Sequence, residues 1–149
     1  MPTRLFFMNV AIRYYSKLGH TRDIANAMGE ELGIKAISIV DEPNLKEEID
    51  ILFLGGAPYA NVMDEKLRTY AKGLNKELVK RVVLFTTSNW SRRTVRSLRK
   101  ILTNKGIEVD EEYFYAHMLN ISNRIPKAKE FVRKKLMPLL TGDLENSKK

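Results

Sequence analysis

The hydrophobic positions of this chain fall into two patterns that alternate along it. Short runs of apolar, β-forming residues indicate buried strands, because a parallel strand covered on both faces carries apolar side chains on both sides. These runs occupy residues 8–15, 34–40, 51–54, 81–87 and 107–116. The pattern therefore predicts five strands.

The segments between the strands carry apolar residues at the three- and four-residue spacing of a helix. Helices are expected at about 21–32, 63–73, 95–102 and 126–138. Gly33 suits the carboxyl-terminal cap of the first helix. Pro126 and Pro138 favour the beginning and the end of the last helix.

Strands that alternate with helices through short connections predict an α/β fold. Because crossovers between parallel strands are right-handed and both faces need covering, we expect a three-layer, doubly wound, five-stranded parallel sheet of order 2-1-3-4-5. The length fits one domain over residues 1–149, in which residues 41–48 support only a short helix or a loop. We interpret residues 1–7 as an N-terminal extension and residues 141–149 as a flexible tail.

The composition, with 44% hydrophobic and 30% charged residues, is that of a globular protein. The absence of cysteine from the sequence excludes disulfides, iron–sulfur ligation by thiolates and a cysteine nucleophile. The apolar run at residues 5–8 is too short for a secretory signal or a membrane span, so we expect a cytoplasmic protein. No His, Asp and Glu residues have the spacing of a metal site.

The net charge of +8, from 26 Lys and Arg against 18 Asp and Glu, is the least expected global property. Such a charge attracts acidic proteins, anionic small molecules or nucleic acid, although most of these side chains are expected to form an ordinary solvated surface. Arg92, Arg93 and Arg96 are candidates for a docking site, because a cation in the first turn of a helix opposes its dipole. The alternative is that their long side chains cover apolar surface.

The residues with the clearest chemistry follow the first predicted strand, in the order Ser16, Lys17, Leu18, Gly19, His20 and Thr21. A loop between a strand and a helix directs backbone N–H groups inward, and the helix adds unsatisfied amides and partial positive charge. Ser16 and Thr21 add hydroxyl donors. These features predict a site for a phosphate or another oxyanion.

This loop resembles the (S/T)-x-T-G-x-T phosphate loop of the flavodoxin family, which binds FMN. Residues 50–59 are similar to the third strand and flavin loop of that family, and residues 82–88 to its fourth strand and second flavin loop. Residues 106–109 match the usual approach to the fifth strand. Because the matches follow the order of the family over most of the chain, they are more specific than the loop alone.

The resemblance implies three groups of cofactor-binding residues. The FMN phosphate would lie on Ser16, Lys17, Leu18, Gly19, His20 and Thr21. The isoalloxazine would contact one loop formed by Pro58, Tyr59, Ala60 and Asn61. Its other contacts would come from Thr87, Ser88, Asn89 and Trp90, where the tryptophan ring is expected to stack on the flavin.

The chain departs from the family pattern at several positions. Leu18 replaces the usual threonine, which removes a hydroxyl donor but not a backbone amide, and His20 stands where asparagine is common. The loop after Tyr59 lacks the glycine whose peptide often adjusts to the redox state of the flavin in electron carriers. The second loop lacks the acidic residues that make the reduced flavin hard to form. These differences argue against the low-potential shuttle role of an acidic flavodoxin.

The leading hypothesis is an FMN-binding, flavodoxin-like protein that exchanges electrons with a redox partner protein and has no catalytic residue of its own. One alternative is an FMN-dependent reductase or oxidase acting on a quinone or porphyrin-like substrate, whose anionic groups would meet the arginines. A second is a flavin-free basic module, although nucleic acid is the less favoured partner. P-loop, receiver-domain and dinucleotide-binding interpretations fail because their motifs are missing.

Two ionisable residues lie outside these loops. Arg13 interrupts the apolar pattern of the first strand, and we expect it to pair with an acid, because an unpaired buried charge is costly. Contact with a ligand is the other interpretation. His117 follows the fifth strand and is interpreted as a structural histidine, with proton transfer to a substrate as the alternative.

Overall fold

The protein is described here by a computed structural model covering residues 3–5, 8–59 and 62–147. Its strands are β1 (Thr3–Leu5), β2 (Met8–Tyr14), β3 (Ala36–Ser38), β4 (Ile49–Gly56), β5 (Pro58–Tyr59), β6 (Val62–Met63), β7 (Val79–Ser88), β8 (Glu108–Val109) and β9 (Phe114–His117). Its helices are α1 (His20–Leu32), α2 (Glu65–Lys72), α3 (Arg93–Asn104) and α4 (Ile121–Ser147).

The central sheet has the predicted parallel topology. β2 lies between β3 and β4, β4 pairs with β7, and β8 and β9 both pair with β7, all in parallel. Counting β2 as the first strand of the parallel sheet and β8 with β9 as the fifth, the order is 2-1-3-4-5. The predicted fold class is therefore confirmed.

β1 adds a strand that the sequence pattern did not predict. It pairs antiparallel with β2, in the register Thr3 to Val10 and Leu5 to Met8. Val10 is also the partner of Ile51 in β4, so β1 occupies the edge of β2 that β3 occupies further along. Part of the predicted extension, residues 3–5, thus belongs to the sheet, whereas residues 1–2 and 6–7 lie outside the described residues.

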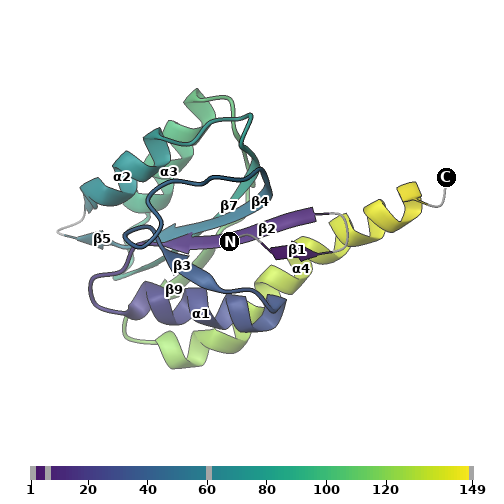
Figure 1. Ribbon diagram of the computed structural model, residues 1–149. Helices are drawn as coiled ribbons and strands as arrows, with labels where there is room; N and C mark the ends of the chain where they lie inside the picture. Colours follow the sequence, from purple (N-terminus) through teal and green to yellow (C-terminus); the bar gives the residue numbers. More distant parts are fainter. Residues whose placement is uncertain (1–2, 6–7, 60–61, 148–149) are drawn as a thin grey trace.

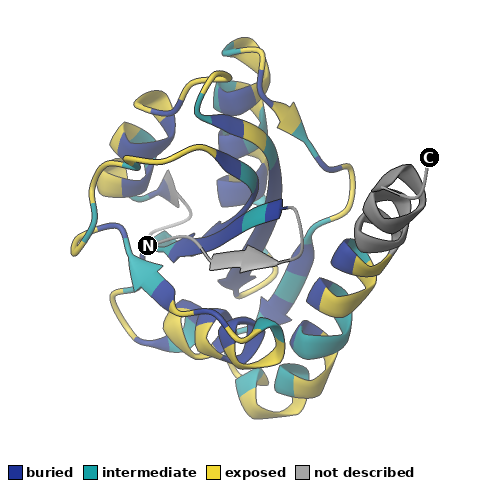
Figure 2. Ribbon diagram, turned by 45° about the vertical axis from the view of Figure 1, so that its right-hand side comes forward, coloured by how far each residue is buried: buried dark blue, intermediate teal, exposed yellow. Residues whose placement is uncertain are grey.

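Helices cover both faces of the sheet in three layers. Figure 1 shows α1 and α4 on one face and α2 and α3 on the other. The buried side chains accordingly form two apolar cores, one for each face. Buried residues concentrate in the strands and on the inward sides of the helices (Figure 2). This arrangement leaves the ends of the strands as the places where loops gather.

Helix α1 lies between two glycines, Gly19 and Gly33, and Gly33 forms the carboxyl-terminal cap that the sequence predicts. Gly33 adopts the left-handed conformation, with φ of 70°, and the amide of Ile34 donates to the carbonyl of Gly29 at 3.0 Å. This contact is a common way to satisfy the last carbonyls of a helix. A side chain at Gly29 would collide with the backbone of Ile34, so the turn into β3 packs tightly on the helix.

The fifth strand differs from its prediction because Asp110 interrupts it. Instead of one strand over 107–116, the structure has β8 and β9, separated by residues 110–113. The carboxylate of Asp110 accepts the amide N–H of Glu112 at 2.9 Å, which forms a local turn that competes with strand pairing. The alternating pattern of residues does not reveal this turn.

The last helix also differs from its prediction. α4 begins at Ile121, ahead of Pro126, and it runs through Pro138 to Ser147. The backbone is therefore helical over 141–147, where a tail was predicted, and residues 148–149 lie outside the described residues. Figure 1 shows this end of α4 extending beyond the sheet. None of the helices in the described part of the chain is long and apolar enough to cross a membrane.

Arg13 is buried in β2 and pairs with an acid, as expected. Its side chain is 1% exposed, and Nη2 lies 2.9 Å from the carboxylate of Glu42 in the connection between β3 and β4. Nη1 donates to the carbonyl of Ile12 at 3.0 Å. Nε has no hydrogen-bond partner among the described residues.

Candidate functional site

The predicted site lies at the carboxyl ends of the parallel strands. Tyr14 at the end of β2 is level with Gly55 in β4, and Gly56 is level with Thr86 in β7. The loops that follow these three strands therefore leave the sheet at the same edge. In an open α/β sheet, this edge beside the point where the strand order reverses is the usual place for a ligand.

The first loop, residues 15–19, has the shape expected of an anion-binding turn. Gly19 is the amino-terminal cap of α1 and adopts a left-handed conformation with φ of 95°. Its amide donates to Ser16 Oγ at 3.0 Å. Within the described residues no side chain caps α1, so its first amides face the loop without a side-chain acceptor. The side chain of Leu18 is exposed and apolar, and therefore offers the loop no hydrogen-bond donor.

Tyr59 closes one side of this loop. Its hydroxyl accepts the amide N–H of Lys17 at 2.7 Å, and Lys17 Nζ lies 4.6 Å from the centre of the Tyr59 ring. Lys17 Nζ also lies 3.2 Å from the carboxylate of Asp64, and this hydrogen bond raises the pKa of Lys17. Burial raises the pKa of Tyr59, against the opposite effect of the Lys17 amide. One loop amide is thus occupied by a phenol oxygen.

The second loop is a short hairpin between β4 and α2. β5 and β6 pair antiparallel, with Pro58 opposite Met63 and Tyr59 opposite Val62. Pro58 and Tyr59 are half-buried beside the first loop. The other two predicted contacts in this loop, Ala60 and Asn61, lie outside the described residues. The hairpin thus places Tyr59 next to the first loop, a contact that residue spacing alone did not predict.

The third loop is joined to the first through two hydroxyls. Thr21 Oγ1 and Thr87 Oγ1 are 2.7 Å apart, and both residues are almost fully buried. Ser88 Oγ donates to the carbonyl of Ser91 at 2.6 Å. In the structure, the contact between Thr21 and Thr87 joins the first turn of α1 to the end of β7 beneath the site. The predicted roles of Thr21, Thr87 and Ser88 in cofactor binding stay predictions.

Trp90 is the most exposed aromatic residue at this edge, with 73% of its surface accessible. Its φ of 75° is left-handed, a costly conformation for a residue with a large side chain. Its amide donates to the Tyr115 hydroxyl at 2.9 Å, which helps to hold that backbone. Strain of this kind is concentrated at functional sites in proteins.

His117 supports Trp90 rather than standing alone. Its ring lies edge-on to the indole, with ring centres 4.8 Å apart. The Leu119 amide donates to Nδ1 at 3.1 Å, so Nε2 carries the proton and donates to Asn89 Oδ1 at 2.8 Å. The structural interpretation of His117 is thus supported, and the histidine fixes the loop that carries the predicted residue Asn89.

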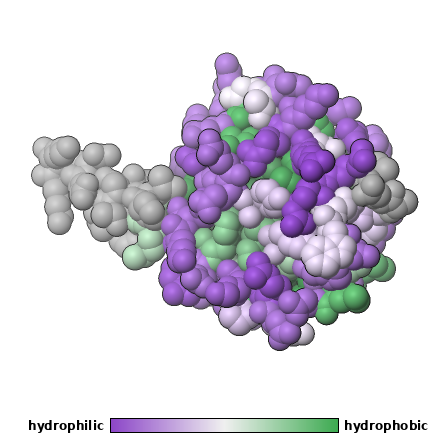
Figure 3. Space-filling model, turned by 180° about the vertical axis from the view of Figure 1, so that it is seen from behind, coloured by the Kyte–Doolittle hydropathy of each residue, from purple (hydrophilic) through white to green (hydrophobic). Residues whose placement is uncertain are grey.

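The arginines of α3 divide into two groups. Arg92 lies over the Tyr115 ring, 3.5 Å from its centre, so its side chain covers aromatic surface as the alternative interpretation proposed. Arg93 and Arg96 are exposed and form no ion pair within the described part of the chain. Figure 3 shows that the face of the molecule seen from behind is largely hydrophilic.

Sequence reasoning missed three residues of this site. Asp64 caps α2 by accepting the amide of Lys66 at 2.8 Å, and the same carboxylate group holds Lys17. Arg22 lies so close to Gly19 that its guanidinium would touch a side chain placed there. The Tyr115 hydroxyl, from the predicted fifth strand, accepts the Trp90 amide and donates to the Ser88 carbonyl. Only Asp64 had a recognisable signal, an acid directly before a helix.

Solved structures with the same arrangement of strands and helices are flavodoxins. Flavodoxin 1 of Bacillus cereus has a TM-score of 0.67 and 16% identity, over 83% of this chain and 95% of that one. The protein has a flavodoxin-like fold. A Fusobacterium nucleatum flavodoxin bound to flavin mononucleotide has a TM-score of 0.64 and 18% identity, over 85% of this chain and 95% of that one.

The flavodoxin-like fold also occurs within larger redox proteins. The match to rubredoxin oxygen:oxidoreductase of Desulfovibrio gigas covers 86% of this chain but only 37% of that larger chain, with a TM-score of 0.59 and 14% identity. No protein-family model and no curated protein matches the sequence. Identities this low establish the fold only, so the function has to be argued from the site.

Proposed function

We propose that this flavodoxin-like protein binds FMN at the carboxyl edge of β2, β4 and β7 and uses it in electron transfer. The observation that carries the proposal is the loop at Gly19, where a left-handed glycine begins a helix without a side-chain cap. Such a loop suits a phosphate group. The neighbouring structures, one of which binds flavin mononucleotide, support the choice of ligand.

The residues of the three loops have distinct roles in this proposal. The amides of residues 17–21 and Ser16 Oγ would hold the phosphate, while the contact between Thr21 and Thr87 keeps α1 and β7 in register. Trp90 would lie against the flavin, since its indole is exposed and held from behind by His117. Bound FMN supplies the redox chemistry, and the protein supplies position and electrostatics.

A direct test compares two glycines that share the same unusual backbone. Gly19 and Gly33 both have positive φ, so a Gly→Ala substitution strains either backbone similarly. Gly19→Ala should weaken FMN binding at least tenfold, because an alanine disfavours the left-handed φ of 95° and would shift the loop amides that hold the phosphate. Gly33→Ala should leave the FMN affinity unchanged. Fluorescence titration with FMN, alongside riboflavin to isolate the phosphate contribution, measures both effects.

Two results would contradict the proposal. One is a wild-type protein that takes up no FMN on titration. The other is a Gly19→Ala protein that binds FMN as tightly as the Gly33→Ala protein. Thermal melting of both variants shows whether a loss of binding reflects the loop or a loss of the folded state.

A second candidate, a flavin-free binding module, is favoured by one contact. The Tyr59 hydroxyl already occupies the Lys17 amide, so the loop is partly satisfied by the protein itself. This candidate predicts a colourless purified protein that takes up no FMN. Steady-state turnover of a quinone with a nicotinamide donor would instead indicate the reductase alternative.

A further inference from the structure

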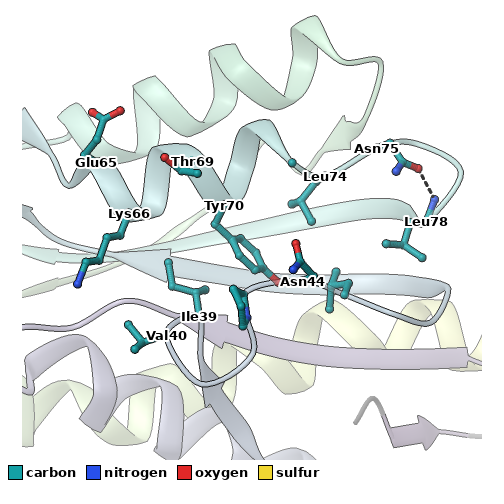
Figure 4. A pocket seen from close by; sticks show the side chains of 13 residues that line it. Ile39, Val40, Asn44, Glu65, Lys66, Thr69, Tyr70, Leu74, Asn75 and Leu78 are labelled. Carbon is teal, nitrogen blue, oxygen red and sulfur yellow. Dashed lines mark hydrogen bonds between the residues drawn. The ribbon is translucent and has the colours of Figure 1, made fainter.

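A hollow lies away from the three loops of the candidate site, on the face of the sheet covered by α2 and α3. It has a volume of about 660 Å³ and lies between α2 and the connection from β3 to β4. Apolar side chains from both segments line it, together with a few polar ones (Figure 4). The lining includes Ile39, Leu45, Tyr70, Leu74 and Leu78.

The hollow exists because the connection from β3 to β4 contains no helix. Residues 39–48 carry the chain across β2 on the side of α2, since Ile39 and Leu45 pack in that core. A crossover between parallel strands usually carries a helix that covers the sheet. Here irregular chain takes its place, and the space that a helix would fill beside α2 remains open.

Tyr70 places an unused hydroxyl at this hollow. The residue is 6% exposed, and its hydroxyl has no hydrogen-bond partner among the described residues. Figure 4 shows the ring extending from α2 towards the connection, and Asn44 of that connection lines the same hollow. Burial raises the pKa of Tyr70 to about 12, so the group is a protonated donor at neutral pH. A buried donor without an acceptor carries a desolvation penalty.

A second unused donor lies close to Tyr70. Arg13 is near enough for its charge to act on the phenol, and its buried Nε also has no partner among the described residues. Arg13 lines a neighbouring hollow of about 410 Å³, and Pro43, Asn44 and Leu45 border both spaces. Both orphan groups are donors. A ligand that suits them must therefore bring an acceptor.

We infer that this hollow binds a small, uncharged, ring-sized apolar molecule whose carbonyl oxygen accepts a hydrogen bond from the Tyr70 hydroxyl. The leucines and Ile39 would contact the ring, and the exposed side chain of Asn44 would turn outward to admit the carbonyl. A charged ligand is disfavoured, because Arg13 is already paired with Glu42 at 2.9 Å. The inference does not depend on FMN, which would bind at the carboxyl edge.

Two probe molecules of the same shape test the role of the carbonyl. Acetophenone carries a ketone, whereas cumene has the same ring and branch without an acceptor. Two-dimensional NMR titration of the isotopically labelled protein should show acetophenone binding at least fivefold more tightly. The amides that shift should include those of Ile39, Leu74 and Leu78, which border the hollow.

Two variants distinguish binding at this hollow from a general affinity of the protein for apolar compounds. Tyr70→Phe should abolish the preference for acetophenone while keeping the fold, since it removes only an unsatisfied hydroxyl. Tyr14→Phe is the matched control, because Tyr14 packs in the core on the opposite face of the sheet, and it should keep the preference.

Three results would overturn the inference. The first is a wild-type protein that does not bind acetophenone at millimolar concentration. The second is a Tyr70→Phe protein that still prefers acetophenone to cumene, and the third is a set of shifted amides that does not border the hollow. None of these outcomes bears on FMN binding, which the Gly19 and Gly33 variants test separately.

Discussion

At the scale of single residues, the candidate site is governed by hydrogen bonds that its loops make to one another. The Lys17 amide, which a bound phosphate would use, is held by the Tyr59 hydroxyl at 2.7 Å. Thr21 and Thr87 are likewise occupied by each other. A ligand at this loop has to replace some of these contacts, so the affinity depends on how much each of them stabilises the free protein.

Tyr59→Phe tests this competition. The substitution removes the oxygen that occupies the Lys17 amide and keeps an aromatic ring beside the loop. FMN should then bind roughly two- to tenfold more tightly, which corresponds to one hydrogen bond of about 0.5–1.5 kcal/mol. Titration with FMN measures the change. Tighter binding of riboflavin by the same factor would contradict the assignment, because riboflavin has no phosphate.

At the scale of elements, the end of the sheet opposite the site is held by a charged cluster. Asp110 after β8 lies 2.9 Å from both Arg81 in β7 and Lys135 in α4. Burial acts to raise the pKa of Asp110, but its hydrogen bonds to Lys135, the Glu112 amide and Arg81 outweigh this and lower it. The turn that interrupts the fifth strand thereby ties the strand to the last helix.

This cluster predicts a stability that depends on pH. A carboxyl whose pKa is lowered in the folded state stabilises it above about pH 4, and the contribution is lost as the pH falls through the folded pKa. Asp110→Asn should cost roughly 1–3 kcal/mol at pH 7, because it weakens the three part-buried hydrogen bonds of the carboxylate to Arg81, Lys135 and the Glu112 amide. The difference from wild type should shrink towards pH 3. Urea unfolding at pH 7, 5 and 3 measures it.

Glu130 offers a matched control for this prediction. Its pKa is also lowered, by the hydrogen bond and charge of Lys134, but the carboxylate is in solvent. Glu130→Gln should therefore change the unfolding free energy much less than Asp110→Asn does. A difference between Asp110→Asn and wild type that stayed constant from pH 7 to pH 3 would show that the cluster is not the cause.

At the scale of the whole molecule, the net charge of +8 favours anionic partners. Arg93 and Arg96 are the exposed cations of α3 next to the candidate site, so we propose that a redox partner protein or anionic substrate docks there. Arg92 is less suited to this role, since its guanidinium lies on Tyr115.

Charge reversal tests this docking surface. Electron transfer from the reduced, FMN-loaded protein to ferricyanide should slow roughly three- to tenfold in Arg93→Glu/Arg96→Glu at about 10 mM ionic strength, where charges act over about 30 Å. Lys76→Glu/Lys80→Glu makes the same charge change near the beginning of β7, at the opposite end of the sheet, and should slow it less. Equal rates for the two double variants would contradict docking at α3.

Much of the fold was predictable because it follows from residues that are close together in the sequence. The hydrophobic patterns of strands and helices and the cap at Gly33 predict the elements, and the right-handed crossover rule predicts the strand order. The errors fall where a non-local contact overrides local preference. Asp110, for example, interrupts the strand and binds Arg81 and Lys135.

The sequence by itself determined most of the elements, the strand order and the loop at Gly19, because these depend on residues close together in the chain. Only the tertiary structure decided which donors are already occupied. Tyr59 reaches Lys17 across 42 positions and Thr87 reaches Thr21 across 66, and no local pattern records such pairs. The same is true of the hollow at Tyr70, because a space between two segments depends on how they pack.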